Sequence, residues 1–141
     1  MKTANFVRQH EDILEIVGEI TGLMNIDSLA SKSEDMVSLL RKFTGKLEAH
    51  LVMEDNVLYP KLFKHESSEV RKIAQEFFDE MGGLKIVLGQ WFEKWTYSGS
   101  IASEPKDFIE ETQGIFSALA QRVEREDTIL YPLVDKLADE S

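Results

Sequence analysis

The chain contains no cysteine among its 141 residues. Disulfides, iron–sulfur clusters, thiolate-bound zinc and covalently attached c-type haem all depend on cysteine thiols, so the sequence excludes each of them. For the same reason, cysteine usage does not indicate an oxidising or a reducing compartment.

Clusters of basic residues are also missing, since 16 Lys and Arg stand against 26 Asp and Glu and the net charge is −10. Nucleic acids and anionic membranes attract concentrated positive charge, so we expect neither as a partner. The N-terminal residues lack the apolar core of a signal peptide, and no apolar run approaches the ~20 residues that a membrane helix needs. We expect a soluble, cytoplasmic protein.

The residues that are present indicate one all-α domain spanning residues 1–141. Its length and its 43% hydrophobic residues suffice for one substantial core, and its 30% charged residues suit a solvated helical surface. Ala, Leu, Glu, Lys and Met, which favour helix, are plentiful, and the three prolines lie near predicted helix ends.

The first half of the chain shows apolar residues at helical spacing in two stretches. The first runs from about Thr3 to Met24, and a connection at Asn25–Ala30 follows it. Ser31 with Glu34 three positions later predicts a capping box that starts the second helix. Pro60 removes a backbone hydrogen bond, so we expect this helix to kink or end near residue 58.

Two more helical stretches follow in the second half of the chain. Ser67 or Ser68 caps the third, Ser98–Pro105 is the clearest loop, and Ser103 precedes a helix start at Glu104-Pro105. Short connections make successive helices antiparallel, which predicts an up-down-up-down four-helix bundle. The expected core includes Leu14, Ile73, Phe77, Phe78, Met81, Leu84, Ile86, Val87, Leu88, Trp91, Trp95 and Ile129.

A near-repeat lies 72 positions apart, with HLVMEDNVLYP at residues 50–60 and RVEREDTILYP at residues 122–132. The residue four positions before the shared glutamate is His50 in the first copy and Arg122 in the second. Because positions i and i+4 share a helix face, His50 and Glu54 can reach one cation. The second copy keeps its carboxylate and carries a permanent positive charge in place of the imidazole.

The repeat relates the first two helices to the last two, so we expect a pseudo-twofold axis in the bundle. The same shift places His10 opposite Gly82, or opposite Gly83 if the hairpins differ by one residue. The pair of glycines inside a helix then allows a close helix contact or leaves a small void where an imidazole would sit. A metal centre built for two ions, with half of its ligands replaced, explains this asymmetry.

The sequence resembles the hemerythrin-like family, whose pattern is His, then His-x-x-x-Glu, then His, then His-x-x-x-Glu. His10, the segment from His50 to Glu54 and the two Leu-Tyr-Pro tails match in order and rough spacing over nearly the whole chain. The resemblance implies a non-haem iron pair that binds oxygen, senses oxygen or nitric oxide, or serves iron storage and repair. The chain departs from the pattern at Gly82 or Gly83 and at Arg122, where histidines are missing.

Two outcomes follow for the remaining side chains. In the first, the metal ligands are His10, His50, Glu54 and Glu126, a shell that suits Fe(II), Mn(II) or Zn(II). Arg122 then takes the place of the second metal and hydrogen-bonds both carboxylates. In the second outcome, Arg122 neutralises the two carboxylates and no metal binds.

Other residues near the motif have supporting roles. We expect Asp55 and Asp127 to maintain helix geometry or to contact the ligands, and Tyr59 and Tyr131 to line the end of the core and hydrogen-bond nearby backbone. His65 lies in a polar connection and is interpreted as a surface residue.

The leading functional hypothesis is therefore a degenerate hemerythrin-like centre that binds at most one metal, with iron expected first. Its role is bacterial-type sensing of a small diatomic ligand or of redox state. The alternative is a metal-free helical module that binds a protein partner through its acidic surface. No Ser/His/Asp set or phosphate-binding glycine loop is present, so hydrolase and nucleotide-binding functions have no support. An oxidase-type enzyme is the least favoured alternative, because no substrate pocket is readable, and we do not expect an enzyme.

Overall fold

A computed structural model describes residues 3–97 and 99–140, which form helices and connections without a strand. The elements are α1 (Ala4–Gly22), α2 (Ile26–Met53), η1 (Glu54–Leu58), α3 (Tyr59–Phe63), α4 (Ser68–Trp95), α5 (Ser100–Ser103), α6 (Pro105–Arg125), η2 (Glu126–Leu130) and α7 (Tyr131–Glu140). The all-helical prediction is confirmed.

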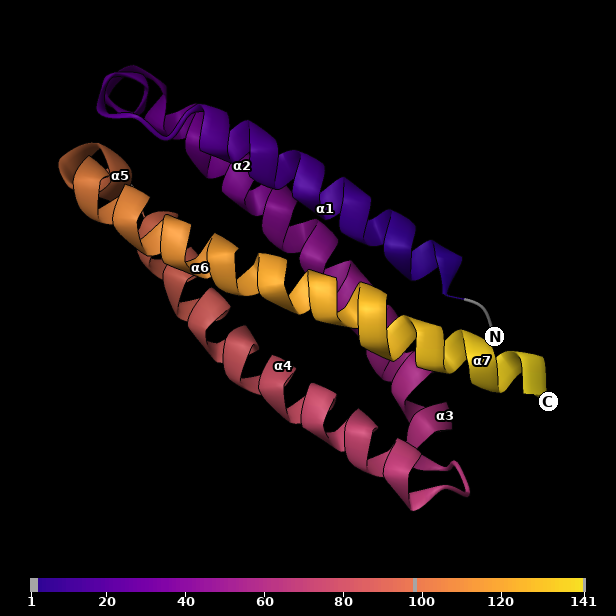
Figure 1. Ribbon diagram of the computed structural model, residues 1–141. Coiled ribbons are helices and arrows are strands. Elements are labelled where there is room, and N and C mark those ends of the chain that lie inside the picture. Colours follow the sequence, from indigo (N-terminus) through magenta and orange to yellow (C-terminus); the bar gives the residue numbers. More distant parts are fainter. Residues whose placement is uncertain (1–2, 98, 141) are drawn as a thin grey trace.

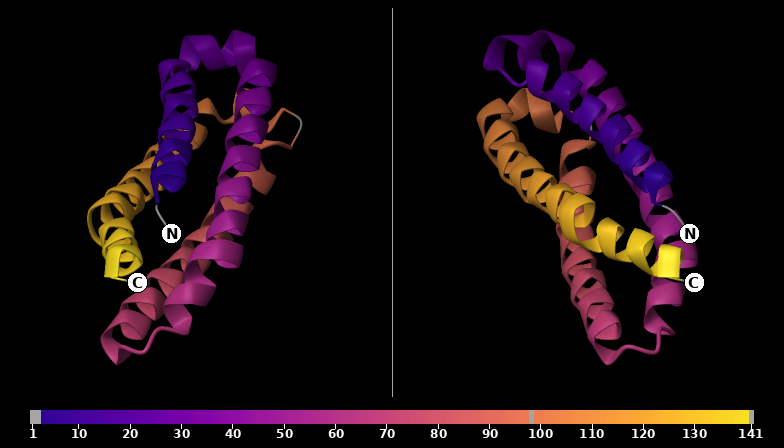
Figure 2. Two further views of the ribbon diagram at one scale, coloured as in Figure 1. Left: turned by 90° about the vertical axis from the view of Figure 1, so that its right-hand side faces the viewer. Right: turned by 45° about the vertical axis from the view of Figure 1, so that its right-hand side comes forward.

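The long helices lie side by side, and the connections between them lie at the two ends of the molecule (Figures 1 and 2). Helix α1 packs along α2, α4 packs against α6, and α2 contacts both α4 and α6. Thr3 ties the start of α1 to α7, because its backbone N–H and its hydroxyl donate to Asp135 at 2.8 and 2.9 Å. The α1–α2 turn and α5 lie at the other end (Figure 1).

The second helix begins earlier than predicted. Asn25 caps α2 by accepting a hydrogen bond from the Ser28 N–H at 2.8 Å, so residues 26–30 are helical and not a connection. The Ser31 hydroxyl faces two backbone carbonyls, which rules out the predicted capping box. A bend does occur next to it, since Lys32 has non-helical angles of φ −124° and ψ 29°.

The third helix begins as predicted, because the Ser67 hydroxyl accepts from the Val70 N–H. The expected loop at 98–105 is different: Ser98 lies outside the described residues, and Ser100–Ser103 forms the short helix α5. Helix α6 begins at Pro105 without a side-chain cap, so Ser103 does not act as its capping residue.

The core consists of two buried apolar clusters. The larger extends over α1, α2, α4, α5 and α6, and the smaller joins the start of α1 to η1, α3, α4, η2 and α7. Between the two clusters, along α1 and where α2 continues into η1 and α6 into η2, five buried polar side chains face the interior: His10, His50, Glu54, Arg122 and Glu126. The candidate site therefore lies between two apolar clusters.

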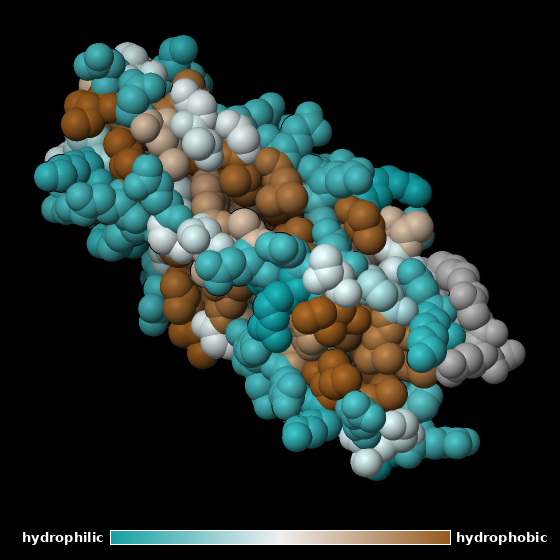
Figure 3. All heavy atoms as spheres, in the orientation of Figure 1, coloured by the Kyte–Doolittle hydropathy of each residue, from teal (hydrophilic) through white to brown (hydrophobic). Residues whose placement is uncertain are grey.

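Some residues predicted for the core are exposed instead. Leu14, Phe78, Ile86, Val87 and Ile129 each expose between 39% and 64% of their surface. The buried face of α4 follows Phe77, Met81 and Leu88, and this register turns its neighbours toward solvent. Apolar patches lie among hydrophilic side chains on the face shown in Figure 3. Within the described residues, no helix is both long and apolar enough to cross a membrane.

Candidate metal centre

A π-helical turn lies within each copy of the sequence repeat. The turn η1 begins at Glu54 and η2 begins at Glu126, and in each the N–H of the tyrosine five residues later donates to the carbonyl of that glutamate. Each π-helical turn interrupts the α-helix just before its proline, so an irregularity is present near residue 58 as predicted, and helical structure then resumes through Pro60 and Pro132. Both glutamates are therefore held at the same point of the same backbone irregularity.

Four side chains converge between the helices. His10 comes from α1, His50 from α2, Glu54 from η1 and Glu126 from η2. One ligand atom from each lies within 4.8 Å of all the others, and each side chain is at most 3% exposed. The four residues predicted from the sequence as metal ligands are thus brought together.

The two histidines present the same ring nitrogen to this point. Their Nε2 atoms lie 3.1 Å apart, and the Nε2 of His10 lies 3.0 Å from Oε1 of Glu126. The Nε2 of His50 is in direct contact with Oε1 of Glu54, one helical turn away. Two nitrogens and two carboxylate oxygens therefore surround a single small volume.

The opposite nitrogen of each ring is held from outside the cluster. The Nδ1 of His10 donates to Asp127 at 2.8 Å, and the Nδ1 of His50 donates to Oε1 of Gln9 at 2.6 Å. The Gln9 amide nitrogen lies against the sulfur of Met53, which directs its oxygen to the ring. With hydrogens fixed on both Nδ1 atoms, both Nε2 lone pairs are directed into the cluster, as metal-binding histidines require.

The sequence missed Gln9 as a functional residue. Its only local signal is its position directly before His10, which carries no chemical information. Asp127, by contrast, was predicted to contact a ligand, and it does so across the interface between η2 and α1.

The carboxylates retain free acceptor atoms. The Tyr131 hydroxyl donates to Oε1 of Glu54 at 3.1 Å, but Oε2 of Glu54 and Oε2 of Glu126 are buried without a hydrogen-bond donor. Arg122 lies within ion-pair range of the Glu126 atom, whereas the Glu54 atom is left without a hydrogen bond; such buried oxygens are unfavourable, and a cation would satisfy them. The donor set therefore fits one transition-metal ion of the kind that accepts imidazole and carboxylate ligands.

Arg122 fills part of the interior next to Glu126. Its Nη2 lies 3.3 Å from Oε2 of Glu126, within ion-pair range but without hydrogen-bond geometry, and donates to the Tyr59 hydroxyl at 3.1 Å. Its Nη1 reaches Glu80 at 3.4 Å, and the guanidinium lies over the Phe77 ring. The prediction that Arg122 hydrogen-bonds both carboxylates is wrong, because Tyr59 and Glu80 draw the guanidinium away from Glu54.

Burial and neighbouring charges shift the pKa values of the cluster. Burial lowers the pKa of His50 to about 4, and the nearby His10 adds to this effect. Burial also acts to lower the pKa of His10, but Glu126 and Asp127 together outweigh it and raise that pKa. The pKa values of Glu54 and Glu126 are raised, chiefly by burial. His50 is therefore neutral at pH 7, and the raised pKa values of His10, Glu54 and Glu126 favour proton binding that competes with a cation.

Met81 is the residue of α4 that lines the internal space beside His10, whereas neither glycine is buried. Phe77 and Met81 are buried four positions apart on α4, as Phe6 and His10 are on α1, which fits an offset of 71 positions in place of the predicted 72 or 73. Gly82 and Gly83 are exposed, and nothing lies within 4 Å of a Cβ built on either. Both expected roles for the glycines, a close helix contact and a void, are therefore wrong.

A small internal cavity adjoins the cluster. Its volume is about 10 Å³, room for roughly one water molecule. His10, His50, Arg122 and Glu126 form its polar side, and its apolar side consists of Ile13, Leu47, Leu51, Met81, Leu119 and Val123. Arg122 also has a buried Nε–H without a partner.

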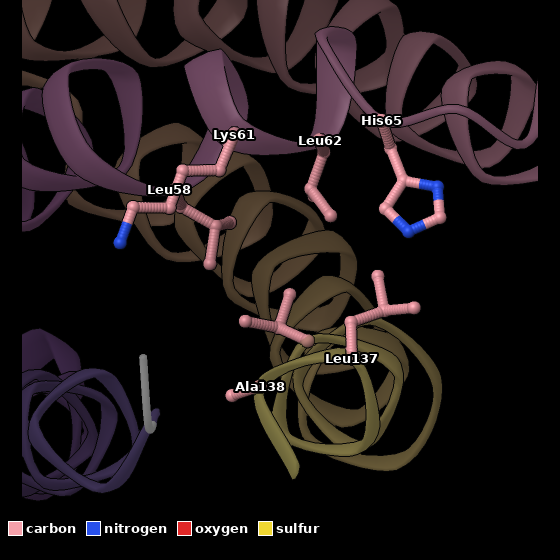
Figure 4. A pocket seen from close by; sticks show the side chains of 7 residues that line it. Leu58, Lys61, Leu62, His65, Leu137 and Ala138 are labelled. Atoms are coloured by element: carbon pink, nitrogen blue, oxygen red, sulfur yellow. The ribbon is translucent and has the colours of Figure 1, made fainter. Parts of the chain in front are cut away.

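The remaining predicted residues lie at the edges of the site. Tyr59 and Tyr131 direct their hydroxyls to Arg122 and Glu54, and not to backbone as predicted. Asp55 turns outward to Lys85 at 3.2 Å and contacts none of the four ligands. His65 is not part of the cluster: it lines a separate pocket between α3 and α7, where its ring lies near Leu137 (Figure 4).

The buried, convergent donors on a helical scaffold define a candidate cation-binding protein. The chain matches the hemerythrin HHE cation binding domain over residues 1–134, and it therefore belongs to this family. The family resemblance inferred from the sequence is confirmed. No curated protein and no solved structure matches the chain.

Proposed function

We propose that the protein binds one non-haem transition metal, iron first and Mn(II) or Zn(II) as alternatives, through His10, His50, Glu54 and Glu126. The observation that carries this proposal is the convergence of two Nε2 lone pairs and two Oε1 atoms while both Nδ1 atoms are engaged elsewhere. A bound iron ion would supply one-electron redox chemistry and a Lewis-acidic position for a small ligand.

The stoichiometry of one ion follows from the second copy of the repeat. A second metal would need ligands in place of Arg122 and Met81, which offer a fixed positive charge and a thioether. Arg122 already pairs with Glu126, so a second cation next to it would be repelled. We infer that the four long helical segments form an up-down-up-down bundle with pseudo-twofold symmetry, on which the two π-helical turns are equivalent.

The role that we propose for the ion is sensing of a small diatomic ligand or of redox state. The adjoining cavity has room for about one water molecule, which suits a small ligand better than an organic substrate. For this reason we favour a sensor over an enzyme. In this role the protein's own residues orient the ligands and exclude water, because the cluster is buried between two apolar clusters.

The first test is elemental analysis of protein purified without a metal-affinity tag, together with an absorption spectrum in air. About one equivalent of iron, manganese or zinc per chain supports the proposal. A spectrum that changes on exposure to nitric oxide, or on oxidation and reduction, supports the sensing role. A trace of metal that anaerobic loading with Fe(II) does not increase would contradict metal binding.

A second candidate rests on the ion pair between Arg122 and Glu126, in which a protein cation already neutralises one buried carboxylate. In this case the protein is a metal-free module that binds a protein partner through its acidic surface. Absence of metal combined with unchanged stability in the presence of a chelator would favour this candidate.

A further inference from the structure

A groove lies on the surface between α2 and α4, and two of the residues that line it, Leu47 and Leu51, also line the internal cavity. The groove has a volume of about 370 Å³, and its apolar lining includes Phe43, Leu88 and Phe92. Glu48, Asp55 and Lys85 are also lining residues, and Asp55 and Lys85 form a half-exposed ion pair. The lining is thus apolar in the main, with charged side chains among it.

Leu47 and Leu51 belong to both spaces. They line the groove, they line the internal cavity, and they expose only 6% and 8% of their surface. A wall that is one side chain thick therefore separates the groove from a cavity that reaches His10, His50 and Arg122. Buried side chains still change rotamer within a close-packed interior, so such a wall can open without any movement of the helices.

The apolar wall and the small cavity determine which molecules can take this route. Apolar side chains form the wall, so an ion would lose its hydration there without gaining a partner. The cavity accepts about one water-sized body, which limits the guest to one or two heavy atoms. A small, uncharged diatomic molecule satisfies both conditions.

We propose that the groove between α2 and α4 is the entrance through which uncharged diatomic molecules reach the internal cavity, and that Leu47 and Leu51 gate it. The inference rests on the proposed function for its purpose, since the cavity adjoins the proposed metal ligands. The route itself does not depend on a bound metal, so it can be tested in the metal-free protein.

The test uses dissolved dioxygen as a paramagnetic probe of the methionine methyl groups in metal-free protein. Met81 lines the cavity, Met36 is fully buried in the larger cluster, and Met53 is 38% exposed. The Met81 signal is assigned with Met81→Leu. We expect dioxygen to relax the methyl group of Met81 more strongly than that of Met36, although both are buried. Equal, weak relaxation of Met36 and Met81 would overturn the proposal.

A matched pair of variants locates the entrance. Leu51→Ala and Leu119→Ala remove the same atoms from two buried walls of the cavity, but only Leu51 also lines the groove. We expect Leu51→Ala to increase the relaxation of Met81 several-fold beyond Leu119→Ala, and Leu51→Phe to decrease it. Equal effects of the two alanine variants would contradict entry through the groove. Leu51→Val and Leu119→Val provide the same comparison if an alanine variant does not fold.

The iron-loaded protein separates the route from the proposed function. If it binds nitric oxide, Leu51→Ala should raise the association and dissociation rates several-fold and leave the dissociation constant unchanged. A changed dissociation constant with unchanged rates would place Leu51 in the binding site and overturn its role as a gate. Failure to bind iron would contradict the proposed function alone, because the dioxygen measurement needs no metal.

Discussion

The Nε2 atoms of His10 and His50 lie 3.1 Å apart in the interior. This contact is imposed from outside, because Asp127 and Gln9 engage the Nδ1 atoms and turn both lone pairs toward each other. Two facing lone pairs repel unless a proton or a metal ion lies between them. Burial acts to lower the pKa of His10, but Glu126 and Asp127 raise it overall, which favours proton binding at this ring in the metal-free protein.

The first prediction concerns the two histidines. His10→Ala and His50→Ala each remove one of four ligands, so we expect bound metal to fall from about one equivalent to a trace. Elemental analysis after identical loading measures the loss. His65→Ala is the matched control, because His65 lies in the pocket between α3 and α7 and should leave the metal content unchanged. Full retention of metal in both cluster variants would contradict this ligand set.

The second prediction concerns the residues that orient the histidines. Gln9→Leu and Asp127→Ala remove the acceptors of the Nδ1 hydrogens, so we expect metal affinity to fall by about 10–100-fold. Asp127→Asn keeps an acceptor oxygen and should lose less affinity than Asp127→Ala. Competition with a chelator of known affinity measures each change. Affinities equal to wild type for both Gln9→Leu and Asp127→Ala would show that the ring orientation does not matter.

The sequence predicted the helical class from helical spacing, and it predicted the four converging ligands from one short spacing, from the repeat and, for His10, from the family resemblance. His50 and Glu54 are one helical turn apart, and the repeat then places Glu126 in an equivalent position. Gln9 could not be found in this way, because its partner His50 lies 41 residues away and only the packing of α1 on α2 brings them together.

Predictions about contacts between helices were less accurate, because an error of one residue in the offset places a different side chain in the core. The offset between α1 and α4 depends on the lengths of the connections, which sequence periodicity does not define, and a shift of one residue exchanged the buried Met81 for the exposed Gly82. Likewise, Arg122 was expected to bridge two carboxylates, but its position depends on Glu80 and Phe77 of α4. A sequence pattern on one helix does not identify the side chains that the next helix presents.

The third prediction concerns stability. A metal that binds only the folded chain stabilises it, by about 2.7 kcal/mol when the free metal is one hundred times the dissociation constant. We therefore expect the Tm to rise by several degrees on loading and to fall again with a chelator. Scanning calorimetry of both forms measures the shift. The same experiment on His50→Ala should give a much smaller shift, whereas an equal shift would indicate binding elsewhere.

The last prediction restores the second half of the centre. Arg122→His completes the His-x-x-x-Glu pattern ahead of Glu126, and Met81→His supplies an imidazole from the α4 position that corresponds to His10. Removing the guanidinium also removes the positive charge that repels a second cation. We expect the double variant to bind more metal than wild type, approaching two ions per chain in elemental analysis.

The controls for this variant separate charge from coordination. Arg122→Lys keeps the positive charge and should remain at one ion per chain. Arg122→Gln removes the charge without adding an imidazole; if repulsion alone limits the stoichiometry, it should gain metal as the double variant does. Glu126 loses its buried partner Arg122 in Arg122→Gln and in the double variant. We therefore expect the metal-free forms of these two variants to be destabilised by about 3–5 kcal/mol, measured by urea unfolding. A double variant that folds but stays at one ion would mean that Arg122 and Met81 do not occupy the place of a second metal.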